Sequence, residues 1–170
     1  VTVKYSGNDT DTKFSSDYFD ETNLLKNYGE IFLRFREGTY AASDRVGQKS
    51  PEFSHKWGEH RFSSDQLKGQ NCLLLFLDER GEFCKQALQI AESVSLKENL
   101  TPVILYIEKQ PENIENRSGA IILEYTGKTA SEYGVTGYPT LFLLDPEGTI
   151  RFVKIGYSPL LAEELELAVR

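Results

Sequence analysis

Two apolar segments separated by a helical pattern constrain the fold of this chain more than any other feature. The first segment, Cys72–Leu77, is apolar throughout, which is typical of a strand covered on both faces. The second segment is residues 102–107, and between the two Phe83, Ala87 and Val94 recur at helical spacing. A helix between two buried strands predicts a right-handed parallel crossover, so we expect an α/β protein.

The segments around this crossover predict a mixed sheet with helices on both faces. The tight turn Asp145-Pro-Glu-Gly148 lies between two apolar segments and therefore indicates an antiparallel pair. Beyond the crossover, the expected elements are two short strands within 53–62, a capped helical turn at 63–67, a strand at 120–125, a helix at 129–133, strands at 140–144 and 149–155, and a helix at 159–169.

The first 44 residues read differently from the rest of the chain. We expect an amino-terminal extension at 1–44 and the main domain at 45–170. Residues 1–20 are rich in Ser, Thr, Asp, Asn and Gly, so they form either a polar tail or a strand docked by scattered aromatic residues. Alternation within residues 30–42 predicts a hairpin.

Charge and composition exclude several functions. The net charge is -7, from 19 basic and 26 acidic residues, which argues against a nucleic-acid partner. No apolar run reaches the roughly 18 residues of a membrane span. Two cysteines and two histidines cannot form the usual four-ligand zinc site, and His55 and His60 lack an evident third ligand, so we expect no metal and no other cofactor. Because the chain opens with Val1 instead of Met, we expect its start to have been removed.

Three motifs carry a family resemblance. VGQKSPEF at 46–53, LKG at 67–69 and YGVTGYPT at 133–140 resemble the thioredoxin superfamily, in particular its TlpA-like branch of AhpC/TSA-type thiol–disulfide oxidoreductases. The resemblance covers residues 45–170 and implies a thioredoxin-like fold. It also implies thiol–disulfide exchange with a protein or peptide partner that carries a disulfide. Members of the branch are secreted or anchored, so we expect an extracytoplasmic location, with any membrane anchor lying outside the given chain.

The active-site position departs from the family pattern. The family places Cys-x-x-Cys at the start of the helix after the first central strand, where a lowered pKa makes the first cysteine a nucleophile. The matching residues here are Gly81-Glu82-Phe83-Cys84, so Gly81 replaces the attacking cysteine and Cys84 holds the resolving position. Leu75 replaces the buried aspartate of many thioredoxins. A peroxiredoxin-like motif measured back from Cys84 fails as well, because its proline and threonine places hold Leu77 and Gly81.

The segment around Pro139 supplies the second half of the expected site. In the family, the proline that follows the residue matching Tyr138 is cis and faces the cysteines, and the backbone beside it pairs with an extended substrate. We therefore expect a cis Tyr138–Pro139 bond and a groove walled by Tyr138 and Phe83. The candidate binding residues are Gly81, Glu82, Phe83, Lys85, Tyr138 and Pro139.

Two functional interpretations follow, and the sequence leaves both open. In the first, the protein keeps a reduced, single-thiol redox activity through Cys84, whose pKa would be lowered near a helix start with Lys85 beside it. In the second, Cys84 is buried and the protein is a redox-inactive module that binds a peptide or protein at the cis-proline groove. Cys72 cannot replace the missing thiol, because a strand of this length puts it ~20 Å from the site and a disulfide needs Cα atoms within about 7 Å. Whether the protein is an enzyme depends on which interpretation holds.

Overall fold

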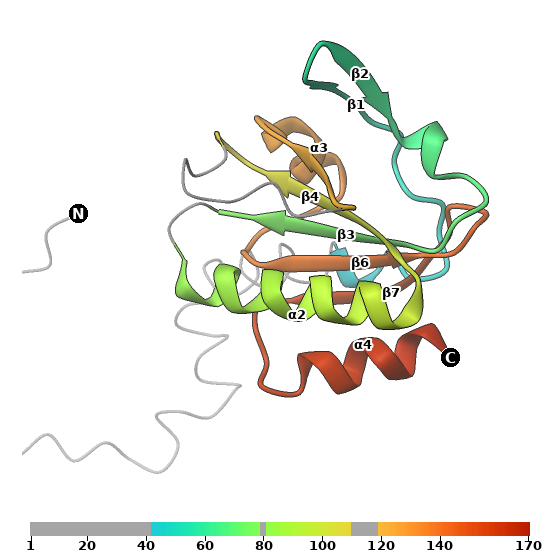
Figure 1. The fold of residues 1–170 in the computed structure, drawn as a ribbon, viewed down its shortest axis with the longest axis vertical. Helices are drawn as coiled ribbons and strands as arrows, with labels where there is room; N and C mark the ends of the chain where they lie inside the picture. Colours follow the sequence, from blue (N-terminus) through green and yellow to red (C-terminus); the bar gives the residue numbers. More distant parts are fainter. Residues whose placement is uncertain (1–41, 79–80, 110–118) are drawn as a thin grey trace, which may run out of the picture. The chain divides into compact units, whose positions relative to one another are not determined.

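The structure is a computed structural model that describes residues 42–78, 81–109 and 119–170. Its centre is a five-stranded mixed sheet in the order β5–β4–β3–β6–β7 (Figure 1). The strands are β3 (Cys72–Leu77), β4 (Thr101–Tyr106), β5 (Ile121–Leu123), β6 (Thr140–Leu144) and β7 (Ile150–Ile155). The mixed sheet predicted from the sequence is confirmed.

Strand β3 lies in the middle of the sheet, and all six of its residues are buried. It runs parallel to β4, with Leu74 opposite Val103, and antiparallel to β6, with Phe76 opposite Thr140. A strand with neighbours on both edges and helices on both faces exposes neither face to solvent, which explains its uninterrupted apolar sequence.

Helices α2 (Glu82–Glu98) and α4 (Leu161–Val169) cover one face of the sheet (Figure 1). They pack through a shared apolar cluster with the side chains of β3 that point to this face. Lys97 of α2 and Glu166 of α4 lie 2.7 Å apart and link the two helices. Helix α4 begins two residues later than expected, because the first turn after Pro159 is not α-helical.

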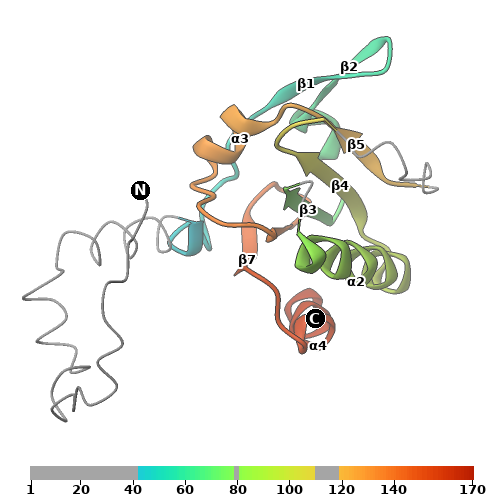
Figure 2. The same cartoon turned by 90° about the vertical axis from the view of Figure 1, so that its left-hand side faces the viewer.

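Helix α3 (Gly127–Glu132) lies on the other face of the sheet (Figure 2). The core there is aromatic: the Tyr133 and Phe142 rings meet edge to face at 5.0 Å, and Phe76 contacts both. The same side of the domain holds the predicted hairpin of β1 (Ser54–Trp57) and β2 (His60–Ser63) and the predicted capped turn, η1 (Ser64–Leu67).

Two expectations differ from the structure in detail. Strand β5 is shorter than predicted, because Tyr125 has a positive φ of 55° and turns the chain into α3. Phe83 was expected on the buried stripe of α2 but is 61% exposed, because it stacks on a ring beyond the sheet instead of facing it. The hairpin expected within residues 30–42 lies outside the described residues apart from Ala42, which is buried in the core.

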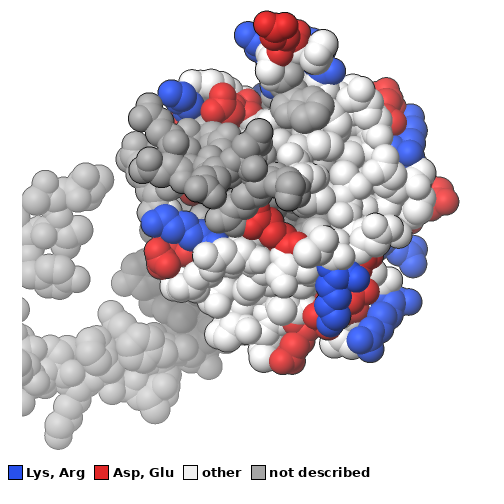
Figure 3. Space-filling view, viewed as in Figure 1, with Lys and Arg blue, Asp and Glu red and all other residues white. Residues whose placement is uncertain are grey.

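The described surface carries both signs of charge. Figure 3 shows Lys and Arg side chains interspersed with Asp and Glu around a broad uncharged area. Within the described residues, no helix combines the length and apolar character needed to cross a membrane.

Candidate functional site

The candidate site lies where β3 ends and α2 begins (Figure 1). Asp78 follows β3 directly and is exposed. Gly81 is the N-cap of α2, and its carbonyl oxygen accepts a hydrogen bond from the Cys84 backbone N–H at 3.0 Å. Gly81 offers no side-chain cap, so this helix start is held by backbone bonds alone.

Gly81 and Cys84 are placed as two members of a disulfide would be. A Cβ atom built on Gly81 lies 3.7 Å from Cβ and 3.3 Å from Sγ of Cys84. Disulfides have Cβ atoms about 3.5–4.5 Å apart. The backbone at positions 81 and 84 is therefore compatible with a disulfide, and position 81 holds glycine.

The Cys84 thiol is buried, with 4% of the residue exposed. Burial raises its pKa, and the Asp78 carboxylate adds to the increase, while a hydrogen bond from the Asp78 backbone works in the opposite direction. The single-thiol interpretation expected a lowered pKa, and the structure gives a raised one. The reason is that removal from water penalises the thiolate more than the hydrogen bond from the Asp78 backbone favours it.

The chain around Pro139 forms the other side of the site. The Tyr138–Pro139 peptide bond is cis, and the Pro139 carbonyl accepts a hydrogen bond from the Gly156 N–H at 2.7 Å. Within the described chain, neither the N–H nor the C=O of Tyr138 has a hydrogen-bond partner. We call the backbone of Tyr138 and Pro139 the Pro139 edge. In the part of the chain that the structure describes, the Tyr138 N–H and C=O are the groups of this edge that are free to pair with another strand, because Pro139 has no N–H and its carbonyl is already bonded.

Asp78 and Tyr138 lie just beyond the paired ends of β3 and β6. The antiparallel register ends with Phe76 opposite Thr140, and Asp78 and Tyr138 each lie two residues further out on their strands. The pKa of the Tyr138 hydroxyl is raised by burial and by the Asp78 charge, which agrees with this placement. Asp78 is a site residue that sequence reasoning missed, although the register of the two strands would have identified it.

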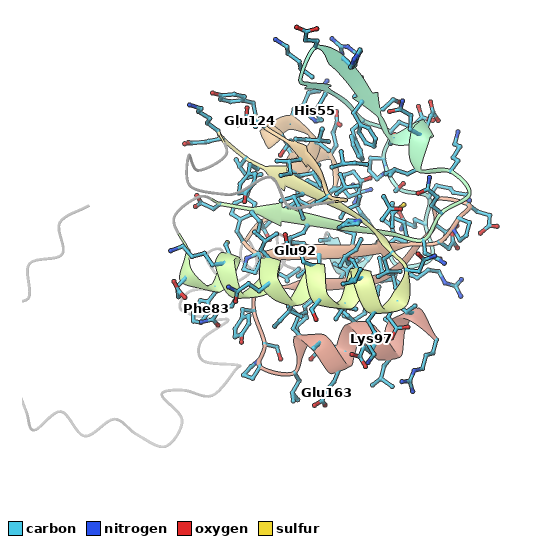
Figure 4. The ribbon with its side chains drawn as sticks, viewed as in Figure 1. His55, Phe83, Glu92, Lys97, Glu124 and Glu163 are labelled. Carbon is cyan, nitrogen blue, oxygen red and sulfur yellow. The ribbon has the colours of Figure 1, made fainter. Side chains whose placement is uncertain are left out.

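An exposed pair of aromatic rings lies next to the Pro139 edge. Phe83 and Tyr157 stack with ring centroids 5.4 Å apart and planes 14° apart. Tyr157 follows Gly156, which is hydrogen-bonded to Pro139, so the rings and the edge form one surface. Figure 4 shows Phe83 at the start of α2. Sequence reasoning did not find Tyr157, because its position after β7 carries no motif.

Comparison with known proteins identifies solved structures that have the same fold. No protein-family model matches the sequence, and no curated protein matches it. Solved structures do match: the thiol:disulfide interchange protein DsbE of Chlorobium tepidum is 21% identical, with a TM-score of 0.60 over 73% of this chain and 94% of that one. The chain has a thioredoxin-like fold.

Two further structures support the same conclusion. StoA of Bacillus subtilis is 24% identical, with a TM-score of 0.53 over 71% of this chain and 98% of that one. The exposed lipoprotein thioredoxin Etrx1 of Streptococcus pneumoniae is 16% identical, with a TM-score of 0.55 over 69% of this chain and 98% of that one. At these identities the similarity establishes the thioredoxin-like fold and leaves the chemistry of the site to its residues.

The charged residues expected around the thioredoxin-like site are solvated. The Lys85 ammonium lies 3.7 Å from a Glu82 carboxylate oxygen, one turn apart on α2, and both side chains are about 70% exposed. An exposed pair of this kind contributes roughly 0.5 kcal/mol or less to stability. Glu82 and Lys85 are therefore available to a partner but do not shape the site.

Cys72 lies at the opposite end of β3 and on the opposite face of the sheet from Cys84. It is 1% exposed, and burial raises the pKa of its thiol to about 11. The expectation that Cys72 is a core residue is confirmed. His55 donates to or accepts from Thr129, with 2.7 Å between Nε2 and Oγ1. Among the residues that the structure describes, no group of three His, Cys, Asp or Glu side chains is placed to hold a metal.

Proposed function

We propose that this protein is a thioredoxin-fold binding module that takes up an extended polypeptide segment at the Pro139 edge without dithiol exchange. One observation carries the proposal: position 81 has the geometry of the attacking cysteine, 3.7 Å from the Cβ of Cys84, and holds no thiol. A site with this geometry can still receive a polypeptide, but it cannot form the covalent bond that the fold's redox enzymes use.

The surroundings of Cys84 argue against exchange by a different route. Disulfide exchange needs a thiolate and access to it, and Cys84 is buried with a raised pKa. Leu75, which stands where many thioredoxins have a buried carboxylate, is fully buried between β4 and β6 and accepts no proton. Within the described chain, a reaction through Cys84 therefore lacks a second thiol beside it and the buried carboxylate at position 75, and the raised pKa leaves little thiolate to act as nucleophile.

Binding by strand addition uses what the site retains. The free N–H and C=O of Tyr138 can pair with a backbone C=O and N–H of an extended segment. Backbone pairing provides affinity, and the side chains beside the edge provide selectivity. The partner we propose is thus a protein or peptide. We also propose an extracytoplasmic location, which is supported by the similarity to an exposed lipoprotein.

A single-thiol activity is the second candidate. It is favoured by the absence of a side chain on Gly81, where a Cβ atom would lie only 3.3 Å from the Cys84 sulfur. In that reaction the Cys84 thiolate would attack a disulfide, form a mixed disulfide and release the other half as a thiolate. The raised pKa of Cys84 makes this candidate the weaker one.

Two measurements separate the candidates. We expect the protein not to accelerate insulin reduction by dithiothreitol, and not to form a mixed disulfide within minutes in excess oxidised glutathione at pH 7.5. We expect the Tyr138 amide resonance of the ¹⁵N-labelled protein to shift when capped, cysteine-free peptides are added at high concentration. The peptide set has the sequence Ser-Thr-Thr-X-Thr-Thr-Ser, in which X is Arg, Lys, Gln, Phe or Glu. Rapid glutathionylation of Cys84 would establish the single-thiol candidate instead. If no member of the peptide set shifts Tyr138, the binding proposal is wrong.

A further inference from the structure

The surface beside the Pro139 edge joins aromatic rings to a carboxylate that forms no ion pair with any residue of the described chain. We propose that this edge selects an extended segment with a cationic side chain, arginine above all, which packs on the aromatic rings and pairs with Asp78. The inference rests on the proposed function and names the class of partner that the site prefers.

Large apolar side chains are exposed on and near this surface. Phe83 is 61% exposed, Tyr138 is 37% exposed, and Leu160, near the start of α4, is 55% exposed. Stacking with Tyr157 covers one side of the Phe83 ring and leaves the other side to solvent. An open aromatic face attracts a cation through the negative charge density of the ring.

Asp78 supplies the charge. It lies just beyond the end of β3, close enough for its charge to act on Tyr138, is exposed, and forms no ion pair in the described chain. At Glu82, the next carboxylate along the described chain, a bound cation would have to compete with the Lys85 ammonium, which lies 3.7 Å away. Asp78 is therefore the carboxylate that a bound cation would reach from a segment paired to the Tyr138 backbone.

Arginine fits this combination better than the other side chains. Its planar guanidinium stacks on aromatic faces and can donate two parallel hydrogen bonds to one carboxylate. A lysine would satisfy Asp78 but would stack less well, because its charge is a compact ammonium group. A phenylalanine would pack on the rings but would remove water from Asp78 without replacing its hydrogen bonds, which is unfavourable. The chain's net charge of -7 also attracts a basic segment at long range.

The test compares host peptides that differ only at X. The capped peptides Ser-Thr-Thr-X-Thr-Thr-Ser with X as Arg, Lys, Gln, Phe or Glu are titrated into the full ¹⁵N-labelled chain, and the shifts of the Tyr138 and Phe83 amides give the dissociation constants. We expect the Arg peptide to bind about tenfold more tightly than the Gln peptide, with Lys between them and Glu weakest. Raising the salt concentration should weaken Arg binding and leave Gln binding almost unchanged.

Matched variants assign the effect to the proposed residues. Asp78→Asn should remove most of the tenfold preference for Arg over Gln, whereas Asp65→Asn, at the other end of the sheet, should keep it. Phe83→Ala should weaken Arg binding about threefold, whereas Leu96→Ala, which is 87% exposed on the same helix, should not.

The outcomes distinguish the two proposals. Shifts at Tyr138 with equal affinity for Arg and Gln, or stronger binding of Phe, overturn the cation preference and leave the binding function standing. Retention of the full preference in Asp78→Asn overturns the role of Asp78. If no peptide, Arg included, moves the Tyr138 resonance, the binding function fails and the preference fails with it.

Discussion

The two ends of β3 are equally buried and chemically opposite. At the amino end, the Cys72 thiol lies 3.4 Å from the Gln70 carbonyl oxygen and 3.7 Å from that of Leu67, and the chain closes over it. At the carboxyl end, Cys84 is nearly as buried, but the Tyr138 backbone and the Asp78 carboxylate have no partner among the residues that the structure describes. Burial alone therefore does not distinguish a structural cysteine from a site cysteine. What distinguishes the two cysteines is whether polar groups near the thiol lack hydrogen-bond or ion-pair partners in the described chain.

We call the carboxyl end of β3, with Cys84 and Asp78 beside it, the open end, and the amino end, with Cys72, the closed end. The largest expected effect comes from placing a second thiol at the open end. Gly81→Cys should form a disulfide with Cys84 on mild oxidation, because the Cβ atoms are already 3.7 Å apart. Mass spectrometry should show the loss of two hydrogens, and insulin reduction should rise from background to a measurable rate. Gly127→Cys is the control, because the nearest atom to its Cβ is the Ile107 side chain at 3.8 Å. Free thiols at both 81 and 84 after oxidation would show that the pairing geometry is wrong.

The second effect contrasts aromatic rings packed on β3 with those at its open end. Phe142→Ala should lower the free energy of unfolding by about 3–5 kcal/mol, because it empties the space between Phe76 and Tyr133. Phe83→Ala should lower it by less than about 1 kcal/mol, because the ring is mostly in solvent. Urea unfolding measures both. Similar losses in the two variants would mean that Phe83 is part of the core.

The third effect compares the two thiols directly. At pH 8, Cys72 should react with iodoacetamide more than about a hundredfold more slowly than a free thiol, because its pKa is about 11 and little thiolate forms. Cys84 should also react more slowly than a free thiol but faster than Cys72, and both rates should rise with pH. Peptide mapping at intervals gives the rates, with equal labelling in denaturant as the control. A Cys84 that outpaces a free thiol would reverse the choice between the two functions.

The smallest effect tests whether Asp78 acts on the open end alone. Removing its negative charge by Asp78→Asn should lower the pKa values of Cys84 and Tyr138, because the carboxylate raises both. Alkylation of Cys84 at pH 8 should become about twofold faster, and that of Cys72 should not change. Asp65→Asn, which removes a charge at the other end, should leave Cys84 as it was. An unchanged Cys84 rate in Asp78→Asn would place that carboxylate farther from the thiol.

The sequence predicted the closed end of the domain better than the open one. The apolar run of β3, the helical spacing in α2 and the turn at 145–148 specify burial, and burial specifies a sheet with helices on both faces. The pairing of Gly81 with Cys84 as the two positions of the family motif stays a prediction, and their closeness follows from local spacing at one helix start.

What the sequence missed depends on contacts between distant segments. Tyr157 meets Phe83 only because β7 and α4 bring it to the start of α2, and no local pattern marks that meeting. The direction of the Cys84 pKa shift was wrong in the single-thiol interpretation, because a lowered value was inferred from neighbours in the sequence and the burial that decides it comes from the sheet.

The place of β3 in the sheet also sets the order in which the chain can fold. Its parallel neighbour β4 follows one helix later, but its antiparallel neighbour β6 is made only after β5 and α3. During synthesis, the edge of β3 that pairs with β6 therefore stays unpaired until the ribosome has added β5, α3 and β6. Contacts so distant in sequence close slowly, and an exposed apolar edge is prone to wrong pairing. The six buried residues that anchor the native sheet are, before β6 appears, the part of the nascent chain most in need of a chaperone.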